Sequence, residues 1–240
     1  MSNLDLTIVV PTYNLGHYLP ETLKSIQQQT IDFELWLIDD ASTDGTAQTV
    51  ADFVKGIPNF HATGFNDHRG IGAARNFGID HATGQAVAFV DGDDLIAPTF
   101  GATLSHGFTS GVVATAVGYD WWHRNRGGPN RFQLLSQREM FDQVSRHGSE
   151  VGGYIWNKAF SRDALTAGNI RYDEQLRIAE DYYFTADFVA HTPGKYAYNP
   201  TILYTKVNRA NSTMHNFSWA DRRQEDQIFE RIHRMRQLIQ

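Results

Sequence analysis

Before about residue 100, short apolar runs rich in β-branched residues alternate with segments of helical period. The runs are Leu6 to Val10, Phe33 to Ile38, Asn59 to Gly64 and Ala86 to Val90. The helical segments cover residues 19–26, a stretch that ends at Val54, and residues 72–81. Thr43 or Asp44 is expected to cap the second of these helices. This alternation is typical of a parallel sheet with crossover helices, so we expect an α/β fold. Because polar motifs directly follow several runs, we expect the ligand crevice at the carboxyl ends of the strands.

After about residue 100 the pattern predicts a mixed second half. Strands are expected over 112–122, after a turn at 127–130, and over 195–204, and helices over 161–167 and 180–191. A closing helix is expected over 219–239, because Ile228, Ile232, Met235 and Ile239 fall on one face. Its arginines are nearly balanced by acidic residues, so packing on the domain or a partner subunit is favoured over a membrane surface.

Bulk composition excludes several classes of protein. The 240 residues are 41% hydrophobic, enough for one compact domain with a core of its own. A net charge of -6 argues against nucleic acid as a partner, and the absence of cysteine excludes thiolate metal sites and cysteine nucleophiles. No basic, apolar leader and no run of about 18 apolar residues is found. A cytoplasmic protein is expected, with peripheral contact at the inner membrane face as the alternative.

The segment Asp91-Gly92-Asp93-Asp94 places carboxylates side by side directly after a buried strand. Such like charges repel unless a cation or a polar ligand compensates them. Oxygen ligands of this kind suit Mg²⁺ or Mn²⁺, which also bind substrate phosphates. The alternative is an acidic turn on a solvated surface.

Two further polar motifs follow the first two predicted strands. They are Pro11-Thr12-Tyr13-Asn14 and Asp39 to Thr46, and in a parallel sheet both face the same crevice as Asp91. An aromatic ring and a carboxylate suit a nucleobase, the ring by stacking and the carboxylate by accepting from an N–H. Helix capping and turn formation explain Thr43 to Thr46 equally well, but explain Asp40 less well.

Residues 70–76, Gly-Ile-Gly-Ala-Ala-Arg-Asn, open a helix with small residues and place a guanidinium in its first turns. Such a helix start can approach a diphosphate. The dinucleotide fingerprint is not met, because Arg75 stands where its third glycine would fall. Close packing of helix on sheet is the favoured role for the glycines.

Taken together, these four stretches resemble the bacterial family 2 glycosyltransferases. Members of that family show a PxYN start, a DD-x-S-x-D segment, a G-x-x-x-ARN helix and a DxDD loop, in this order. The resemblance covers residues 5–100 and continues more thinly through 156–162, 180–184 and 209–214. It implies the GT-A, Rossmann-like nucleotide-diphospho-sugar transferase fold. It also implies one catalytic domain over 1–240, with a nucleotide-sugar half (about 1–100), an acceptor half (about 101–215) and a C-terminal helix (about 216–240).

The resemblance also implies a role for individual residues. Pro11, Thr12, Tyr13 and Asp40 would hold the base, Arg75 the donor, Asp91 the ribose or the metal, and Asp93 the metal. Asp94 competes with Asp93 for the metal and otherwise joins the nucleotide-sugar site. His215 is a candidate third metal ligand, with a solvated loop histidine as the alternative. The cofactor implied is Mn²⁺ or Mg²⁺.

Asp181 corresponds to the general base of the family, although acids at a helix start are also favoured by the helix dipole. The acceptor hydroxyl must lose its proton as it attacks, and a positioned carboxylate can take it. One direct displacement inverts the anomeric centre. The resemblance implies UDP as the carrier and a cell-surface polysaccharide, lipopolysaccharide or other envelope glycan as the destination.

Trp121, Trp122, Tyr154 and Trp156 are candidates for an acceptor-sugar platform, with core packing as the alternative. Two other functions compete with the transferase. A nucleotidyltransferase would need a basic, glycine-rich loop after the first strand, and residues 11–17 contain neither lysine nor arginine. A non-catalytic nucleotide- or carbohydrate-binding module would need no general base.

Overall fold

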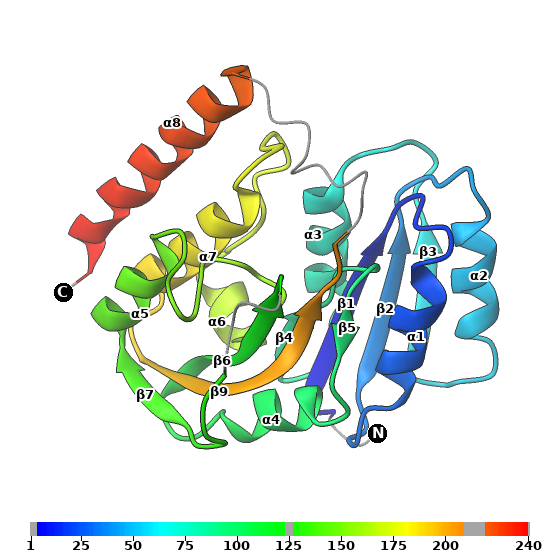
Figure 1. The fold of residues 1–240 in the computed structure, drawn as a ribbon, viewed down its shortest axis with the longest axis horizontal. Helices are drawn as coiled ribbons and strands as arrows, with labels where there is room; N and C mark the ends of the chain where they lie inside the picture. The colour runs from blue at the N-terminus through cyan, green and yellow to red at the C-terminus, as the bar shows by residue number, and fades with distance from the viewer. Residues whose placement is uncertain (1–3, 123–126, 209–218, 240) are drawn as a thin grey trace.

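One mixed β-sheet runs through residues 4–122, 127–208 and 219–239, the part of the protein that the computed structural model describes (Figure 1). Within these ranges nine strands pair in the order β3-β2-β1-β4-β8-β6-β9-β5, and β7 pairs with β9. The strands are β1 (Leu6–Thr12), β2 (Glu34–Asp39), β3 (Phe60–Gly64), β4 (Ala86–Phe89), β5 (Leu95–Ile96), β6 (Val112–Trp121), β7 (Gln133–Ser136), β8 (Lys158–Ser161) and β9 (Lys195–Lys206).

The helices that cover this sheet divide between the two halves of the chain. They are α1 (Leu19–Gln27), α2 (Thr46–Phe53), α3 (Ile71–His81), α4 (Phe100–His106), α5 (Gln137–Val144), α6 (Arg162–Ala167), α7 (Glu180–His191) and α8 (Trp219–Met235), followed by the short 3₁₀ helix η2 (Arg236–Leu238). Right-handed crossovers place α1 and α2 on one face of the parallel strands and α3 on the other. The predicted α/β fold with helices flanking a central sheet is confirmed.

The parallel half of the sheet explains why its strands are recognisable in the sequence. β1 pairs in parallel with both β2 and β4, and all seven of its residues are buried. A strand covered on both faces needs a continuous apolar run, which Leu6 to Val10 supplies. Because the chain reverses direction across the sheet at β1, the carboxyl ends of β1 and β4 border the crevice typical of open α/β sheets.

The second half of the sheet is built mainly from long-range pairing. β8 inserts antiparallel between β4 and β6, and the 12-residue β9 runs alongside β6, β7 and β5. The helix α5, which the periodicity did not predict, begins at a capping box of Ser136 and Glu139. The helix α4 and the strands β5 and β8 were also not predicted. They are short, and β5 and β8 are defined chiefly by their partners.

The cap predicted for α2 is wrong. Gly45 holds the N-cap position with φ 90°, and neither Thr43 nor Asp44 caps the helix from that position. Asp44 instead accepts hydrogen bonds from the backbone N–H of Thr46 at 3.0 Å and of Gly16 at 2.9 Å. It therefore ties the loop after β2 to the loop after β1.

The C-terminal helix α8 lies along the outer side of the second half, next to α7 (Figure 1). Its apolar stripe is buried at Ile228, Ile232 and Met235, so the predicted packing against the domain is confirmed. Within the described ranges, none of the helices combines the length and the apolar character needed to cross a bilayer.

Candidate active site

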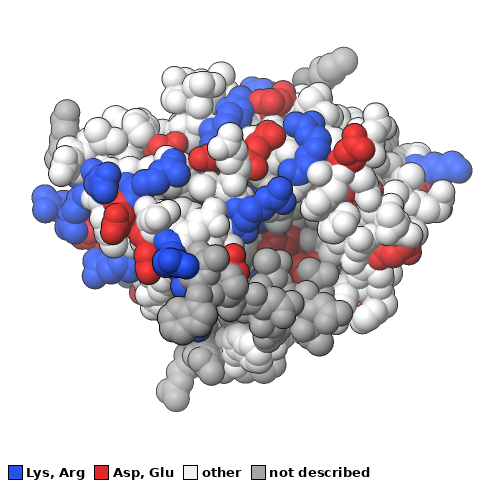
Figure 2. Space-filling view, turned by 90° about the horizontal axis from the view of Figure 1, so that it is seen from above, with Lys and Arg blue, Asp and Glu red and all other residues white. Residues whose placement is uncertain are grey.

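A cleft of about 610 Å³ opens at the carboxyl ends of the parallel strands. In the view from above, acidic side chains are visible at the bottom of a central hollow, with basic side chains beside it (Figure 2). The cleft is lined by residues from segments 11–15, 68–75, 91–93, 174–182 and 206–208. The predicted nucleotide-sugar, metal and catalytic residues found in its wall are Pro11, Thr12, Tyr13, Asp40, Arg75, Asp91, Asp93 and Asp181. His215 lies outside the described residues.

At one end of the cleft, Asp40 organises the loop before α3. Its carboxylate accepts hydrogen bonds from the backbone N–H of Arg69 at 2.7 Å and of Gly70 at 2.8 Å, and His68 Nδ1 lies 2.9 Å from Oδ2. The Tyr13 ring stacks on His68, with ring centroids 4.1 Å apart. A flat aromatic surface therefore lies beside a carboxylate that already has backbone partners. His68 was missed by the sequence analysis, because only its place in the fold brings it beside Tyr13.

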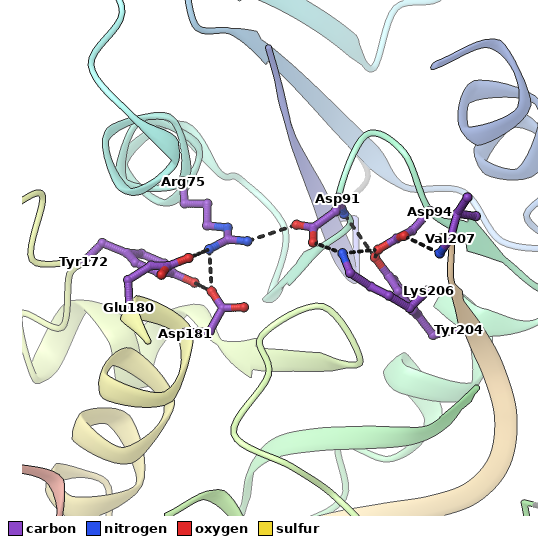
Figure 3. A network of polar contacts seen from close by, with 9 residues as sticks. All are labelled: Arg75, Asp91, Asp94, Tyr172, Glu180, Asp181, Tyr204, Lys206 and Val207. Atoms are coloured by element: carbon purple, nitrogen blue, oxygen red, sulfur yellow. Dashed lines mark hydrogen bonds and ion pairs between the residues drawn. The ribbon is translucent and has the colours of Figure 1, made fainter. Parts of the chain in front are cut away.

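The centre of the site is the guanidinium of Arg75, which is almost fully buried (Figure 3). Its Nη2 lies 2.9 Å from Asp91 Oδ1, while Nη1 lies 3.4 Å from Glu180 Oε1 and also donates to Asp181 Oδ1. Burial opposes the charge of Arg75, but the surrounding carboxylates outweigh it and raise its pKa well above the usual value. One rigid planar group thus connects the acidic loop after β4 to the start of α7.

Burial has the opposite effect on the carboxyl groups at the start of α7. It raises the pKa of Glu180 to about 7, with the neighbouring Asp181 adding to the effect and Arg75 opposing it. The pKa of Asp181 is also raised, mainly by burial. The preceding residue, Ala179, adopts a left-handed backbone conformation with φ 50°, which is uncommon for a residue other than glycine. The chain therefore turns at Ala179, directly before Glu180 and Asp181, which both line the cleft.

On the other side of Arg75, the acidic loop is held by the end of β9 (Figure 3). Asp94 is completely buried, accepting from Tyr204 Oη at 2.6 Å and from the backbone N–H of Val207 at 2.8 Å. Lys206 Nζ lies 2.9 Å from Asp94 Oδ2 and 2.8 Å from Asp91 Oδ2. The structure thus places Asp94 beneath the cleft, where both of its oxygens have protein partners. The sequence analysis missed Tyr204 and Lys206, which come from the far end of a long strand.

These surroundings shift the pKa values of Asp91 and Asp94 in opposite directions. Burial acts to raise the pKa of Asp91, but Lys206 and Arg75 outweigh it and bring the pKa to about 2. Burial raises the pKa of Asp94 to about 7, with Asp91 and Asp93 adding to the effect and Lys206 opposing it. Asp91 is therefore the more strongly ionised of the two.

The acidic loop has the composition of a divalent-cation site. Oxygen atoms of Asp91, Asp93 and Asp94 lie within 4.8 Å of one another. Asp91 and Asp93 line the cleft, whereas Asp94 does not. Among the described residues that line the cleft, the carboxyl groups outnumber the Lys and Arg cations: the acids are Asp40, Asp91, Asp93, Glu174, Glu180, Asp181 and Glu225, and the cations are Arg69, Arg75, Arg177 and Lys206. A hard divalent ion fits this excess of carboxylate oxygen.

The aromatic candidates divide between the cleft and the core. Trp121 and Tyr154 line the cleft and meet edge to face, with ring centroids 5.6 Å apart. Trp156 also borders the cleft, but it is 2% exposed and stacks between Tyr154 and Tyr204, so it packs mainly as a core residue. Trp122 is exposed and is not among the described residues that line the cleft.

Sequence relatives support the family resemblance. The chain is 30% identical over 187 residues to the minor teichoic acid biosynthesis protein GgaB of Bacillus subtilis, covering 75% of this chain and 20% of that protein. It is 27% identical over 188 residues to the uncharacterized glycosyltransferase EpsJ of the same organism, covering 75% of this chain and 54% of that protein. The chain therefore spans between a fifth and about half of the length of these relatives.

Solved structures confirm the predicted GT-A fold. S. aureus TarS 1–349 in complex with UDP-GlcNAc has a TM-score of 0.73 at 21% identity, covering 90% of this chain and 62% of that chain. The mannosyltransferase PcManGT from Pyrobaculum calidifontis, in complex with GDP-Man and Mn²⁺, has a TM-score of 0.66 at 22% identity, covering 88% and 59%. Residues 7–166 match the family described as glycosyl transferase family 2. This chain belongs to glycosyl transferase family 2.

Proposed function

We propose that this protein is an inverting, metal-dependent glycosyltransferase that moves one sugar from a nucleotide diphosphate-sugar to an acceptor hydroxyl. The observation that supports this most directly is the position of Arg75. Its guanidinium binds Asp91 in the acidic loop with one nitrogen and Asp181 at the start of α7 with the other. The candidate donor site and the candidate base are thereby held at a fixed separation across one cleft.

Asp181 serves in this proposal as the general base. The acceptor oxygen attacks the anomeric carbon while its proton passes to the Asp181 carboxylate. The bond between the anomeric carbon and the diphosphate oxygen breaks, and its electron pair leaves with the nucleoside diphosphate. Burial raises the pKa of Asp181, so its carboxylate accepts a proton more readily than an exposed aspartate does. One displacement inverts the anomeric centre, and no carboxylate is assigned as a nucleophile.

In this proposal the donor binds along the part of the cleft lined by residues 11–13, Asp40 and the acidic loop. The nucleobase lies beside Tyr13 and Asp40, next to Pro11 and Thr12, with the aromatic surface of Tyr13 offering a stacking contact. Asp91 and Asp93 would hold a Mn²⁺ or Mg²⁺ ion, which when bound supplies positive charge to the diphosphate. Arg75 contributes by fixing the direction of the Asp91 carboxylate.

We propose a UDP-sugar as donor and a cell-surface polysaccharide or other envelope glycan as the product. The similar TarS structure contains UDP-GlcNAc, and the relatives include proteins named for teichoic acid and succinoglycan biosynthesis. Trp121 and Tyr154 line the same cleft as Asp181, and in this proposal their rings contact the acceptor sugar.

The proposal is tested by Asp181→Asn, with Asp187→Asn as the matched control. Asp187 lies on the same helix, pairs with His191, and is not among the described residues that line the cleft. Binding of UDP-sugars is measured by calorimetry, and transfer by release of UDP in the presence of acceptor. A screen of donors by thermal shift first identifies the sugar, because a ligand at 100 times its Kd stabilises by about 2.7 kcal/mol.

Loss of a general base typically lowers the rate by about 10² to 10⁴. We expect Asp181→Asn to lose transfer by this amount while its donor affinity stays within about threefold of the parent. Asp187→Asn should transfer at the parent rate. A folded Asp181→Asn variant that transfers within about threefold of the parent would exclude Asp181 as the base, with Glu180 the next residue to test.

A further inference from the structure

Lys206, the last residue of β9, lies between two aspartates of the acidic loop. Its Nζ is 2.8 Å from Asp91 Oδ2 and 2.9 Å from Asp94 Oδ2, and the side chain is 21% exposed at the cleft wall. β9 brings it there in register with Trp121 at the end of β6. The ammonium therefore contacts Asp91, which the proposed function assigns to the divalent ion, and Asp94, which lies beneath the cleft.

The two contacts of Lys206 have different consequences. Asp94 has independent partners on both oxygens, Tyr204 Oη on one and the backbone N–H of Val207 on the other. Asp91 has Arg75 on Oδ1 and Lys206 on Oδ2. Removal of the ammonium thus leaves Asp94 anchored to β9, but leaves Asp91 with one oxygen facing the cleft and its charge less compensated.

An ammonium at hydrogen-bond distance acts against a second cation at the same carboxylate. The repulsion between a unit charge and a divalent ion is substantial at separations of about 4 Å, even with the screening of water. A nucleoside diphosphate that binds together with the ion offsets this repulsion, because its negative charge attracts both the ammonium and the ion. The four-carbon stem of lysine allows Nζ to turn from Asp91 towards an anion without moving the backbone.

We propose that Lys206 is an internal counter-ion that weakens binding of the bare divalent ion and favours an ion accompanied by a nucleoside diphosphate. This inference rests on the proposed function, because it assigns a regulatory charge to the same site. By linkage, the coupling is reciprocal: UDP strengthens binding of the ion by the same factor by which the ion strengthens binding of UDP.

The test is binding of Mn²⁺ to the full chain, measured by calorimetry with and without saturating UDP. The variants are Lys206→Met, which removes the charge, Lys206→Gln, which keeps a hydrogen-bond donor, and Lys206→Arg, which keeps the charge. Lys195→Met, an exposed lysine at the other end of β9, is the matched control.

We expect Lys206→Met and Lys206→Gln to bind Mn²⁺ alone on the order of tenfold more tightly than the parent, because a positive charge next to the ion is removed. UDP should then strengthen Mn²⁺ binding about tenfold less than it does in the parent, and UDP alone should bind more weakly. Lys206→Arg and Lys195→Met should resemble the parent.

A purely structural role of Lys206 would give a different pattern, with Mn²⁺ and UDP binding weakened together and the melting temperature lowered. That result, or unchanged Mn²⁺ affinity in both neutral variants, overturns the inference and leaves the transferase proposal standing. If no variant binds Mn²⁺ even with UDP present, the inference and the metal dependence of the proposed function both fail. Lys206→Gln preserves the test if the methionine variant does not fold.

Discussion

Replacing Arg75 by methionine removes the guanidinium that joins the two walls of the cleft while keeping an apolar stem of similar length. The side chain of Arg75 is 2% exposed, and its partners Asp91, Glu180 and Asp181 are 14 to 18% exposed. Lys206 remains in contact with Asp91 after the change, but Glu180 and Asp181 lose the cation with which they pair. The variant therefore leaves two buried acids close to each other without their guanidinium.

The expected size of the effect follows from burial. Removing one partner of a buried ion pair costs about 3–5 kcal/mol, because the charge left behind is uncompensated. The matched control is Arg171→Met, which breaks an ion pair with Asp80 of 2.8 Å whose side chains are 30% and 53% exposed. Exposed pairs contribute about 0–1 kcal/mol, so the two arginines should differ by at least about 2 kcal/mol.

The effect should also depend on pH in one direction. Burial already raises the pKa of Glu180 to about 7, above its unfolded value of 4.5, and also raises the pKa of Asp181. Loss of Arg75 raises both further. An acid with a raised folded pKa contributes stability that is present below its unfolded pKa and is lost as the pH rises through its folded pKa. The destabilisation by Arg75→Met should thus be largest near pH 8 and smaller near pH 5.

Urea unfolding followed by tryptophan fluorescence at pH 8 and pH 5 measures the loss of unfolding free energy and its dependence on pH. A domain with about 5–15 kcal/mol of stability retains a measurable folded population after such a loss. Donor binding by Arg75→Met is measured in parallel at the pH where the variant is folded. A loss below about 1 kcal/mol at pH 8, as expected of a surface pair, or a loss that grows towards pH 5, would refute this reasoning.

Two further substitutions test other parts of the buried polar network. Glu180→Gln mimics the protonated acid. In thermal unfolding, the free energy of unfolding of this variant relative to the parent should therefore rise from near zero at pH 4.5 to at most about 3 kcal/mol at pH 8. A gain in stability that is independent of pH would contradict the raised pKa of Glu180. Lys158→Met removes a buried amino group that donates to the carbonyl oxygens of Gly152 at 2.7 Å and Tyr154 at 2.6 Å. Loss of these bonds should cost at least about 2 kcal/mol in urea unfolding, whereas the exposed Lys195→Met should stay within about 0.5 kcal/mol of the parent. Equal effects of the two lysine substitutions would argue against this role of Lys158.

The first half of the fold was predictable because local pattern and tertiary environment agree there. The run Leu6 to Val10 is apolar throughout, since β1 is covered on both faces, and the observed strand extends it by only two residues. The predicted end of α3 at His81 and the predicted range of α7 match the structure. Among the features predicted for this half, the cap of α2 failed, because Asp44 binds the neighbouring Gly16 loop in addition to its own helix start.

The second half was less predictable because its short elements depend on partners far away in the sequence. β8 comprises Lys158–Ser161, and its strand geometry comes from antiparallel pairing with β4 and β6. α5 carried a readable signal, since Ser136 followed three residues later by Glu139 is a capping box. The hydrophobic period alone did not reveal it.

The residues of the site also divide into those that local sequence motifs predict and those that only the tertiary fold brings together. Motifs directly after strands led to Asp40, Asp91 and Asp93, because the carboxyl ends of parallel strands converge. No local pattern marks Lys206 as a partner of Asp91, or His68 as a partner of Tyr13. Those contacts depend on the path of β9 and on the loop before α3, which are decided by packing.

The bonds between Asp94 and the end of β9 also determine when the site can form. Asp94 completes its hydrogen bonds with Tyr204 and Val207, which lie 110 and 113 positions later in the chain. During synthesis the parallel strands can emerge and pair long before these residues leave the ribosome. Until then Asp94 lacks its hydrogen bonds to the end of β9. A fragment ending near residue 100 would carry the predicted nucleotide-binding motifs but would leave a carboxylate that is buried in the complete fold unsatisfied. Donor-binding competence is therefore expected late in biogenesis, when β9 joins the sheet.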